Sequence, residues 1–402
     1  QVVMTPLVAN LDDDNGDGLI DERDIPEIVF MTFCDSAYTT NGVLRAVHGG
    51  GPNRGADFFA TCGSTDWHEG DDPSVSCSCS AAQLDPTSTP AVGDIDGDGV
   101  PEIVAITENS TVQLFSNTGA VLAESAQSVG GNNPAISIVN LDGEGFAELV
   151  IGDDVLTFVR DSTGNVIFGD IFRGNLGDGR NSQGPISCVA DLDGDGRQDI
   201  VGGSTAYRYP AKPAGAVLRS DCTGGETGDE EAWCDGELVV MWDGQTVNGA
   251  AAQRNGFCAV ADVWGAAAGT PPGPANPLDG VPEVILVATD HIQIFDVTSG
   301  VLIEDRSAPG RGGAPNVDDF DGDGFPEIGA AFGDRYQLVD LQPPTAACPA
   351  WPNVFVDELT GLQGNVARTA PSATCSGVSS MRPPATRSDS CAFSRNWLVS
   401  TG

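Results

Sequence analysis

The residues best suited to chemistry in this sequence are carboxylates placed at alternate positions in glycine-rich turns. The most regular copy is Asp94-Ile95-Asp96-Gly97-Asp98-Gly99-Val100-Pro101-Glu102, in which a fourth acid follows three aspartates. Carboxylate and carbonyl oxygens gathered this closely suit a hard divalent cation, and Ca²⁺ best, because it accepts many oxygen ligands in a flexible geometry. Without a cation these carboxylates repel one another at close range. One copy alone could be a solvated acidic turn, but the pattern recurs.

Further segments carry the same pattern, either complete or altered. One copy substitutes an amide at its first position and a longer acid at its fifth, and another is interrupted by an insertion. Such repetition indicates a repeat architecture. The candidate ligands are Asp94, Asp96, Asp98 and Glu102; Asn140, Asp142, Glu144 and Glu148; Asp191, Asp193, Asp195 and Asp199; Asp262, Asp279 and Glu283; and Asp319, Asp321, Asp323 and Glu327.

The segments around each acidic loop read as β-strands. A short apolar segment precedes the loop, a β-branched run such as 102–106 follows it, and two alternating segments joined by a Gly turn come next. This order makes a four-stranded antiparallel unit. Four-stranded units repeated radially make a β-propeller. The sequence therefore predicts an all-β fold, a β-propeller of four-stranded antiparallel blades with six readable repeats over residues 1–341.

Insertions and a different C-terminal segment interrupt this pattern. The closing acids of successive copies lie 44–51 residues apart, except for two intervals of 75 and 84 residues. The extra residues fall within 34–89, 207–235 and 265–277, and insertions of repeat proteins often gather on one face. Residues 342–402 contain no acidic loop, and are equally compatible with a tail, an inserted module or a degenerate last blade.

The most N-terminal loop is expanded and admits two alignments. Asp12 with Glu27 fits the frame of the other copies. A second set matches the spacing of an EF-hand-type calcium loop, although flanking helices are lacking and its last ligand is Asp instead of Glu. We favour a calcium loop embedded in an enlarged blade loop. This second set is Asp13, Asn15, Asp17, Asp21 and Asp24.

Composition limits the compartment and the partners. The formal net charge of −40, from 58 acidic and 18 basic residues, disfavours nucleic acid and anionic membrane surfaces. No apolar run reaches the length of a membrane span, so membrane insertion is not expected.

Eleven cysteines fit an oxidising compartment. Cys77 with Cys79, and Cys222 with Cys234, look like loop staples, and the odd total leaves a thiol that is free, bonded to another chain or missing its partner. A chain that opens on Gln1 without a signal peptide is expected to be a processed or cropped secreted or cell-surface protein.

The acidic loops and their Pro-Ala lead-ins resemble the FG-GAP repeats of integrin α-subunits and the related VCBS repeats of bacterial surface proteins. The resemblance covers roughly residues 5–341. It implies a β-propeller, usually seven-bladed, with Ca²⁺ in the loop between the first two strands of a blade. Carried over by position, it implies one ion in each of the loops 94–102, 191–199 and 319–327. Binding is expected to be weaker at 140–148, and in total three to six calcium ions are expected.

The resemblance also indicates a role. Propellers of this family mostly serve as rigid extracellular scaffolds or adhesive modules, so other extracellular proteins or glycans are the expected partners. We do not expect an enzyme, because only three histidines are present and neither a Gly-x-Ser-x-Gly elbow nor a phosphate-cradling loop occurs.

Two alternative functions stay open. One is a lectin or a polysaccharide-degrading enzyme on the same scaffold, with exposed tryptophans stacking on sugars; the favoured interpretation of these tryptophans is that they pack insertions onto blades. The other is a subunit of a surface fibre that self-assembles through its C-terminal segment. The residues concerned are Trp67, Trp233, Trp242 and Trp264 for the first, and Cys348, Cys375 and Cys391 for the second.

Overall fold

The structure, a computed structural model, describes residues 4–33, 41–61, 83–131, 133–267, 269–320, 324–333 and 335–342. Within these ranges the strands form six antiparallel sheets, each built from strands consecutive in the chain. Five sheets have four strands and the last has three. The predicted all-β fold of antiparallel blades is confirmed, and a seventh blade stays a prediction.

The blades are numbered here in chain order. Blade 1 contains β1 (Leu7–Ala9), β2 (Glu27–Phe33), β3 (Gly42–His48) and β4 (Asp57–Ala60); blade 2 contains β5 (Ala91–Gly93), β6 (Glu102–Ile106), β7 (Val112–Phe115) and β8 (Val121–Glu124); blade 3 contains β9 (Ser137–Val139), β10 (Glu148–Ile151), β11 (Asp154–Arg160) and β12 (Val166–Arg173). Blade 4 contains β13 (Cys188–Ala190), β14 (Asp199–Gly202), β15 (Thr205–Arg208) and β16 (Val239–Asp243); blade 5 contains β17 (Phe257–Ala261), β18 (Glu283–Val287), β19 (Thr289–Asp296) and β20 (Leu302–Arg311); blade 6 contains β21 (Asn316–Asp318), β22 (Glu327–Phe332) and β23 (Arg335–Val339).

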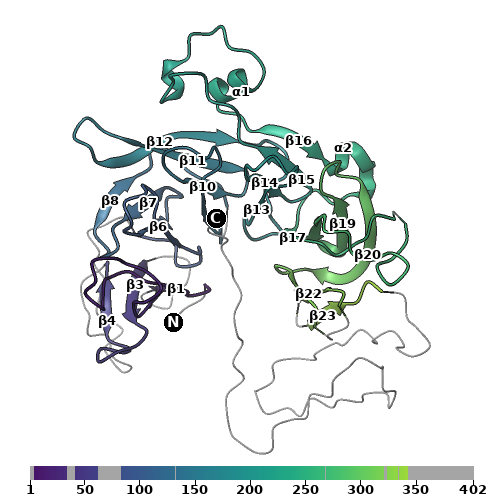
Figure 1. The fold of residues 1–402 in the computed structure, drawn as a ribbon, viewed down its shortest axis with the longest axis horizontal. Coiled ribbons are helices and arrows are strands. Elements are labelled where there is room, and N and C mark those ends of the chain that lie inside the picture. The colour runs from purple at the N-terminus through teal and green to yellow at the C-terminus, as the bar shows by residue number, and fades with distance from the viewer. Residues whose placement is uncertain are drawn as a thin grey trace, which may run out of the picture.

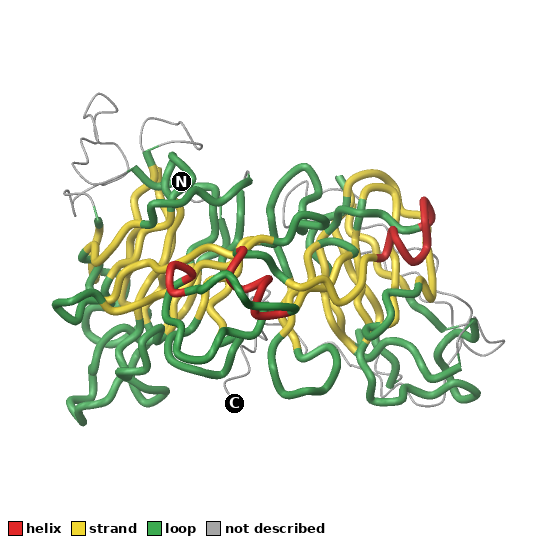
Figure 2. Tube along the Cα trace, turned by 90° about the horizontal axis from the view of Figure 1, so that it is seen from above, coloured by secondary structure: helices red, strands yellow, loops and turns green. Residues whose placement is uncertain are grey.

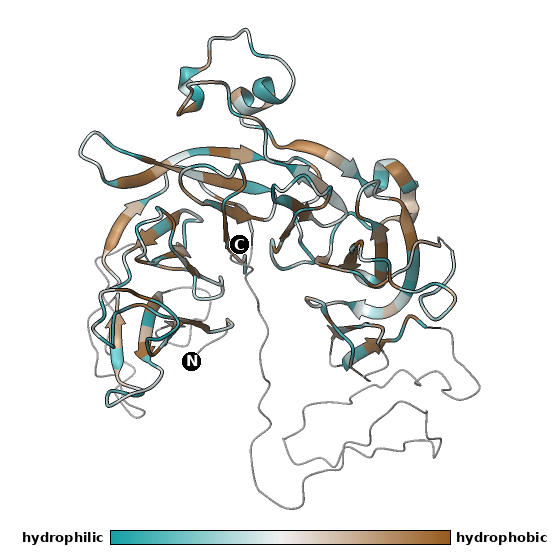
Figure 3. Cartoon of the chain, in the orientation of Figure 1, coloured by the Kyte–Doolittle hydropathy of each residue, from teal (hydrophilic) through white to brown (hydrophobic). Residues whose placement is uncertain are grey.

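The blades follow one another along an arc around a common centre, with blades 1 and 6 at its two ends (Figure 1). The hydrophobic core lies between them: each of five clusters of buried side chains unites two consecutive blades. The second strand of a blade supplies much of this core because its β-branched residues are buried on both faces, as in β6 and β18. The apolar strands are visible as brown arrows in Figure 3.

Antiparallel order sorts the connections onto two faces, which Figure 2 shows edge-on. In every blade the loop between the first and second strands carries the acidic pattern. In the five four-stranded blades the loop between the third and fourth strands lies at the same end of the sheet. The turn between the second and third strands, and the connection to the next blade, lie at the other end. We call these the acidic-loop face and the connector face.

The described helices are short and belong to connections. The 207–235 insertion of blade 4 contains η1 (Arg219–Asp221) and α1 (Asp229–Asp235), while α2 (Gly244–Asn248) and η2 (Gly249–Ala251) lie between blades 4 and 5. None of the described helices is long and apolar enough to cross a membrane.

Two disulfides involve described residues. Cys222–Cys234 confirms the predicted staple of the 207–235 insertion. The sequence did not predict Cys188–Cys258, which joins β13 to β17 and so links blades 4 and 5. Cys77 and Cys79 lie outside the described residues, as do Trp67, Cys348, Cys375, Cys391 and everything after Gln342.

Candidate metal centres

The loops 94–102 and 191–199 fold alike around their first aspartate. Asp94 Oδ1 accepts hydrogen bonds from the Gly97 and Asp98 amides, at 2.8 and 3.1 Å, and its Oδ2 accepts one from Gly99 at 2.9 Å. Gly97 and Gly99 have φ values of 77° and 86°, which favour glycine and explain its spacing. Asp191 makes the same three bonds to 194, 195 and 196, at 2.8, 3.1 and 2.9 Å.

The closing acid is the first residue of the second strand, and its carboxylate accepts a hydrogen bond from the backbone near the start of the loop. Glu102 Oε2 accepts the Ile95 amide at 2.9 Å, and Asp199 Oδ2 accepts the Leu192 amide at 3.1 Å. Both closing acids are buried. In the other blades the same bond is made by Glu27 with Leu11, Glu148 with Leu141, Glu283 with Val263 and Trp264, and Glu327 with Phe320.

Carboxylates meet closely in these two loops. Oxygens of Asp94, Asp96 and Glu102 lie within 4.8 Å of one another, as do those of Asp191, Asp193 and Asp199. Asp98 and Asp195 belong to the same loops but not to these groups; their Oδ1 atoms accept the amides of 100 and 197 at 2.8 Å. Oxygen-only donor sets of this kind fit a hard cation such as Ca²⁺.

The closing acids resist ionisation when no cation is bound. Burial raises the pKa of Glu102 to about 7, and the carboxylates of its own loop act in the same direction. Burial together with the neighbouring aspartates raises the pKa of Asp199 to about 6 and that of Glu283 to about 7. A bound cation would lower these pKa values again, because it favours the ionised carboxylate. The raised pKa values therefore indicate loops in which a positive charge would be stabilising.

The expanded first loop contains both alignments at once. Oxygens of Asp12, Asp14 and Glu27 lie within 4.8 Å of one another, which matches the frame of the other blades. Asp14 is not among the ligands predicted from the sequence, although its alternate spacing after Asn10 and Asp12 fits the pattern. His48 Nδ1 lies 3.3 Å from Glu27 Oε1, a neighbour that sequence order does not reveal.

Inside that loop a second turn repeats the fold of the regular loops. Asp13 accepts the amides of 16, 17 and 18, at 2.7, 3.1 and 2.7 Å. Asn15 Oδ1 accepts the Asp17 amide at 3.0 Å, and the buried Asp24 receives the Asn15 amides at 3.2 and 2.8 Å. Asp21 instead pairs with Arg23, which also lies 3.1 Å from Asp17. The structure thus accommodates the EF-hand-type spacing within the blade loop.

The loop 140–148 is different. Asn140 makes no hydrogen bond within the described residues, and the loop's own turn consists of the Glu144 amide donating to Asp142 at 2.8 Å. Lys212, from the insertion of blade 4, places Nζ 3.7 Å from both Asp142 Oδ2 and Glu144 Oε2. Burial raises the pKa of Glu148 to about 8. This loop therefore meets a cation supplied by the protein.

The fifth loop is brought together despite its insertion. Asp262 Oδ2 accepts the Gly280 amide and Asp279 Oδ1 the Val281 amide, at 2.8 and 2.9 Å. These bonds match those of Asp94 and Asp98, so the first, fifth and closing positions are kept, whereas Trp264 stands at the third. Asp262 Oδ1 is enclosed and has no hydrogen-bond partner within the described residues.

The sixth loop is described in part. Asp319 Oδ2 accepts the Gly324 amide at 2.9 Å, as Asp94 does from Gly99, and Glu327 is buried. Asp321 and Asp323 lie outside the described residues.

Three of the tryptophans considered for sugar stacking can be placed. Trp233, Trp242 and Trp264 are 2 %, 5 % and 2 % exposed, so they pack inside the protein and do not offer surfaces for sugars.

Arg160, at the end of β11 in blade 3, reaches the loop of blade 2, where Nη2 lies 2.9 Å from Asp96 Oδ2. No local sequence pattern indicates this contact between blades.

Comparisons with known proteins agree with a repeat architecture. Residues 184–218, which include the loop 191–199, match the FG-GAP repeat. No curated protein matches the chain.

Among solved structures, the V. cholerae biofilm matrix protein Bap1 is 20 % identical over 80 % of this chain, with a TM-score of 0.49, and this chain spans 42 % of its length. BamB from Moraxella catarrhalis is 13 % identical over 80 % of this chain and 72 % of its own, with a TM-score of 0.38. A lectin from Agrocybe aegerita that recognises terminal N-acetylglucosamine is 12 % identical over 78 % of this chain and 77 % of its own, with a TM-score of 0.34. The six antiparallel sheets and the match over 184–218 show an all-β repeat protein with blade-like sheets, one of whose repeats is of FG-GAP type.

Proposed function

We propose that this chain is an extracellular β-propeller whose acidic loops bind Ca²⁺, and that it acts as a rigid adhesion or structural interaction module. The observation that carries this proposal is the geometry shared by the loops 94–102 and 191–199. In both, one aspartate organises the turn, a buried acid closes it, and oxygens of three acids converge. The FG-GAP match over 184–218 supports the same role for the loop it contains.

Calcium would act on stability in this proposal. An ion that binds the folded loop and not the unfolded chain adds RT ln(1 + [L]/Kd), about 2.7 kcal/mol for each site at a hundredfold excess over Kd. Several such sites would make a folded propeller depend on calcium. The disulfides Cys188–Cys258 and Cys222–Cys234 support an oxidising, extracellular setting.

The proposal gives the chain a binding role and no catalytic one. Of the described histidines, His48 contacts Glu27, the closing acid of the first loop. His291 pairs with Asp305 at 2.8 Å across the neighbouring strands β19 and β20. Both contacts are explained by charge balance and need no catalytic role. His68 lies outside the described residues. Other extracellular proteins or glycans are the proposed partners, and self-assembly into a fibre is the second candidate.

A thermal melt of the full chain tests the proposal. In excess Ca²⁺ we expect a melting temperature well above that in EDTA, with Mg²⁺ restoring little of the difference, because Mg²⁺ demands a tighter octahedral geometry. Elemental analysis should find two or more calcium ions per chain, and light scattering on the same sample reports whether the chain assembles. An equal melt in calcium and EDTA, with no bound calcium, would refute the metal assignment.

A further inference from the structure

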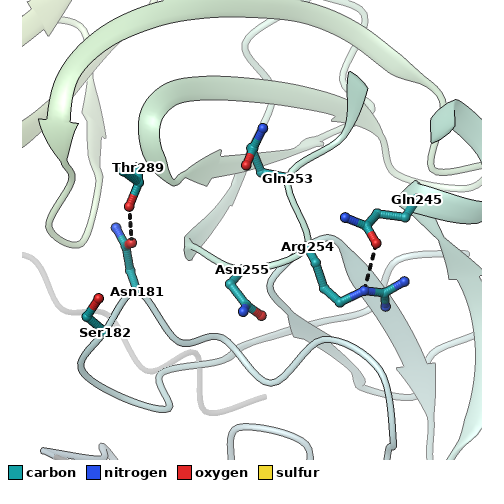
Figure 4. Close-up of a pocket in the computed structure, with 7 residues that line it drawn as sticks. All are labelled: Asn181, Ser182, Gln245, Gln253, Arg254, Asn255 and Thr289. Carbon is teal, nitrogen blue, oxygen red and sulfur yellow. Dashed lines mark hydrogen bonds between the residues drawn. The ribbon is translucent and has the colours of Figure 1, made fainter. Parts of the chain in front are cut away.

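A polar pocket lies on the connector face, away from the acidic loops. It has a volume of about 360 Å³. Its walls come from the connection between blades 3 and 4, the connection between blades 4 and 5, and the start of β19 (Figure 4). The lining residues are Asn181, Ser182, Gln245, Gln253, Arg254, Asn255 and Thr289.

Buried amides hold the walls in place. Asn181 is 5 % exposed; its Nδ2 donates to the Gly312 carbonyl at 2.7 Å and its Oδ1 accepts the Thr289 hydroxyl at 2.9 Å. Gln293 is fully buried, accepts the Gln253 amide at 2.8 Å and donates to the Ala251 carbonyl at 2.7 Å. These bonds join segments far apart in the sequence, so the pocket is preorganised, which lowers the entropy cost of binding.

The one charged lining residue has its charge balanced by the protein. Arg254 donates from Nε to Gln245 Oε1 at 2.8 Å, and its Nη2 lies 3.3 Å from Asp243 Oδ2. Asp243 is 7 % exposed and is not one of the lining residues. The pocket therefore presents an approximately neutral surface.

Several lining side chains are still available for a ligand. The Ser182 hydroxyl and the side-chain amides of Gln253 and Asn255 make no hydrogen bond within the described residues, and Ser182 and Asn255 are exposed. Each of these groups can both donate and accept. The lining contains no aromatic or aliphatic side chain apart from methyl and methylene groups, so an apolar ligand would gain little there.

The geometry points to this pocket as a binding site for an uncharged sugar residue. Adjacent sugar hydroxyls need donors and acceptors side by side, as the free amides and hydroxyl provide them. An acidic sugar fits less well, because Asp243 already balances Arg254 and the net charge of −40 repels anions. This inference rests on the proposed role as an interaction module and names the ligand class and the place where it binds.

A binding experiment with matched variants tests the inference. The full chain in excess Ca²⁺ is screened by saturation-transfer NMR against neutral hexoses, N-acetylhexosamines and uronic acids, and the best neutral sugar is then titrated. The double variant Gln253→Ala/Asn255→Ala should bind at least tenfold more weakly. Asn255→Trp, which fills the pocket, should also abolish binding. Asn53→Ala, an exposed amide on the acidic-loop face, is the control and should bind as the wild type does.

The outcomes separate this inference from the proposed function. Loss of sugar binding in both pocket variants with unchanged melts supports the pocket. Absence of neutral-sugar binding, equal binding by all variants, or a preference for uronic acids overturns it. The calcium dependence of the melt is measured on the same samples, so a calcium-stabilised chain that binds no neutral sugar refutes only the pocket. Sugar binding by a chain that calcium does not stabilise refutes only the metal assignment.

Discussion

The loops 191–199 and 140–148 occupy the same place in neighbouring blades, yet they differ in what balances their charge. Asp191 accepts three backbone amides, and the acids of its loop make no ion pair within the described residues. Asn140 organises no such turn, and Lys212 stands 3.7 Å from two acids of that loop. The comparison shows that the first aspartate organises the backbone of its loop, and that the loop without this aspartate meets a lysine from the next blade. In our proposal an external ion takes the place of that lysine in the loop 191–199.

The largest effect is expected from removing the organising aspartate. Asp191→Ala deletes the acceptor of three backbone bonds together with a proposed calcium ligand, so we expect the free energy of unfolding in Ca²⁺ to fall by about 3 kcal/mol. The bound calcium should fall by one equivalent. Asn140→Ala is the matched control and should change stability by less than about 0.5 kcal/mol. Denaturant unfolding and elemental analysis measure both, and equal effects of the two substitutions would remove the distinction between the loops.

An intermediate effect is expected from pH in EDTA. Burial raises the pKa of Asp199 to about 6 and that of Glu102 to about 7, above the unfolded values. The unfolded state therefore releases these protons first, and the free energy of unfolding should fall as pH rises from the ordinary carboxyl pKa toward about 7. Excess Ca²⁺ should flatten this slope, and Asp199→Asn should reduce it in EDTA. A stability that rises over the same interval would contradict the assignment.

The smallest effect is expected from converting one loop into the other type. Asn140→Asp combined with Lys212→Met restores the first carboxylate and removes the competing ammonium group. The double variant should bind one additional calcium ion and gain about 1 kcal/mol of stability in Ca²⁺ over the wild type. Lys212→Met alone is the control and should gain no ion, because Asn140 still cannot organise the turn. Calcium binding by the wild-type loop, detected as a loss on Glu148→Gln, would show that Lys212 does not replace the ion.

Most of the fold could be predicted from the sequence, because strands and turns depend on residue patterns within a few positions of one another. The β-branched runs at 102–106 and 283–287 became buried second strands, and glycines at alternate positions became the turns around Asp94 and Asp191. The interrupted fifth loop also kept its pairing, since Asp262 and Gly280 are hydrogen-bonded across the insertion.

Contacts between blades could not be predicted in the same way. Lys212 and Arg160 reach acidic loops of the preceding blade, and Cys188 meets Cys258 across blades. Asn181 binds the carbonyl of Gly312, 131 residues away. Each depends on how far neighbouring blades are rotated and on where insertions turn, and no local pattern encodes either. Asp14 differs from these residues, because its place in the alternating acidic pattern is visible in the sequence although it is not among the predicted ligands.

The bond between Cys188 and Cys258 has a mechanical consequence. It joins the first strands of blades 4 and 5, which lie 70 residues apart in sequence. If the chain is pulled from its two ends, tension passes through the sulfur bridge and bypasses everything between the two cysteines. Roughly 240 Å of extended chain is thereby withheld from stretching. Blade 4, with its repeat of FG-GAP type, is shielded from load, and the blades outside the bridge should yield first.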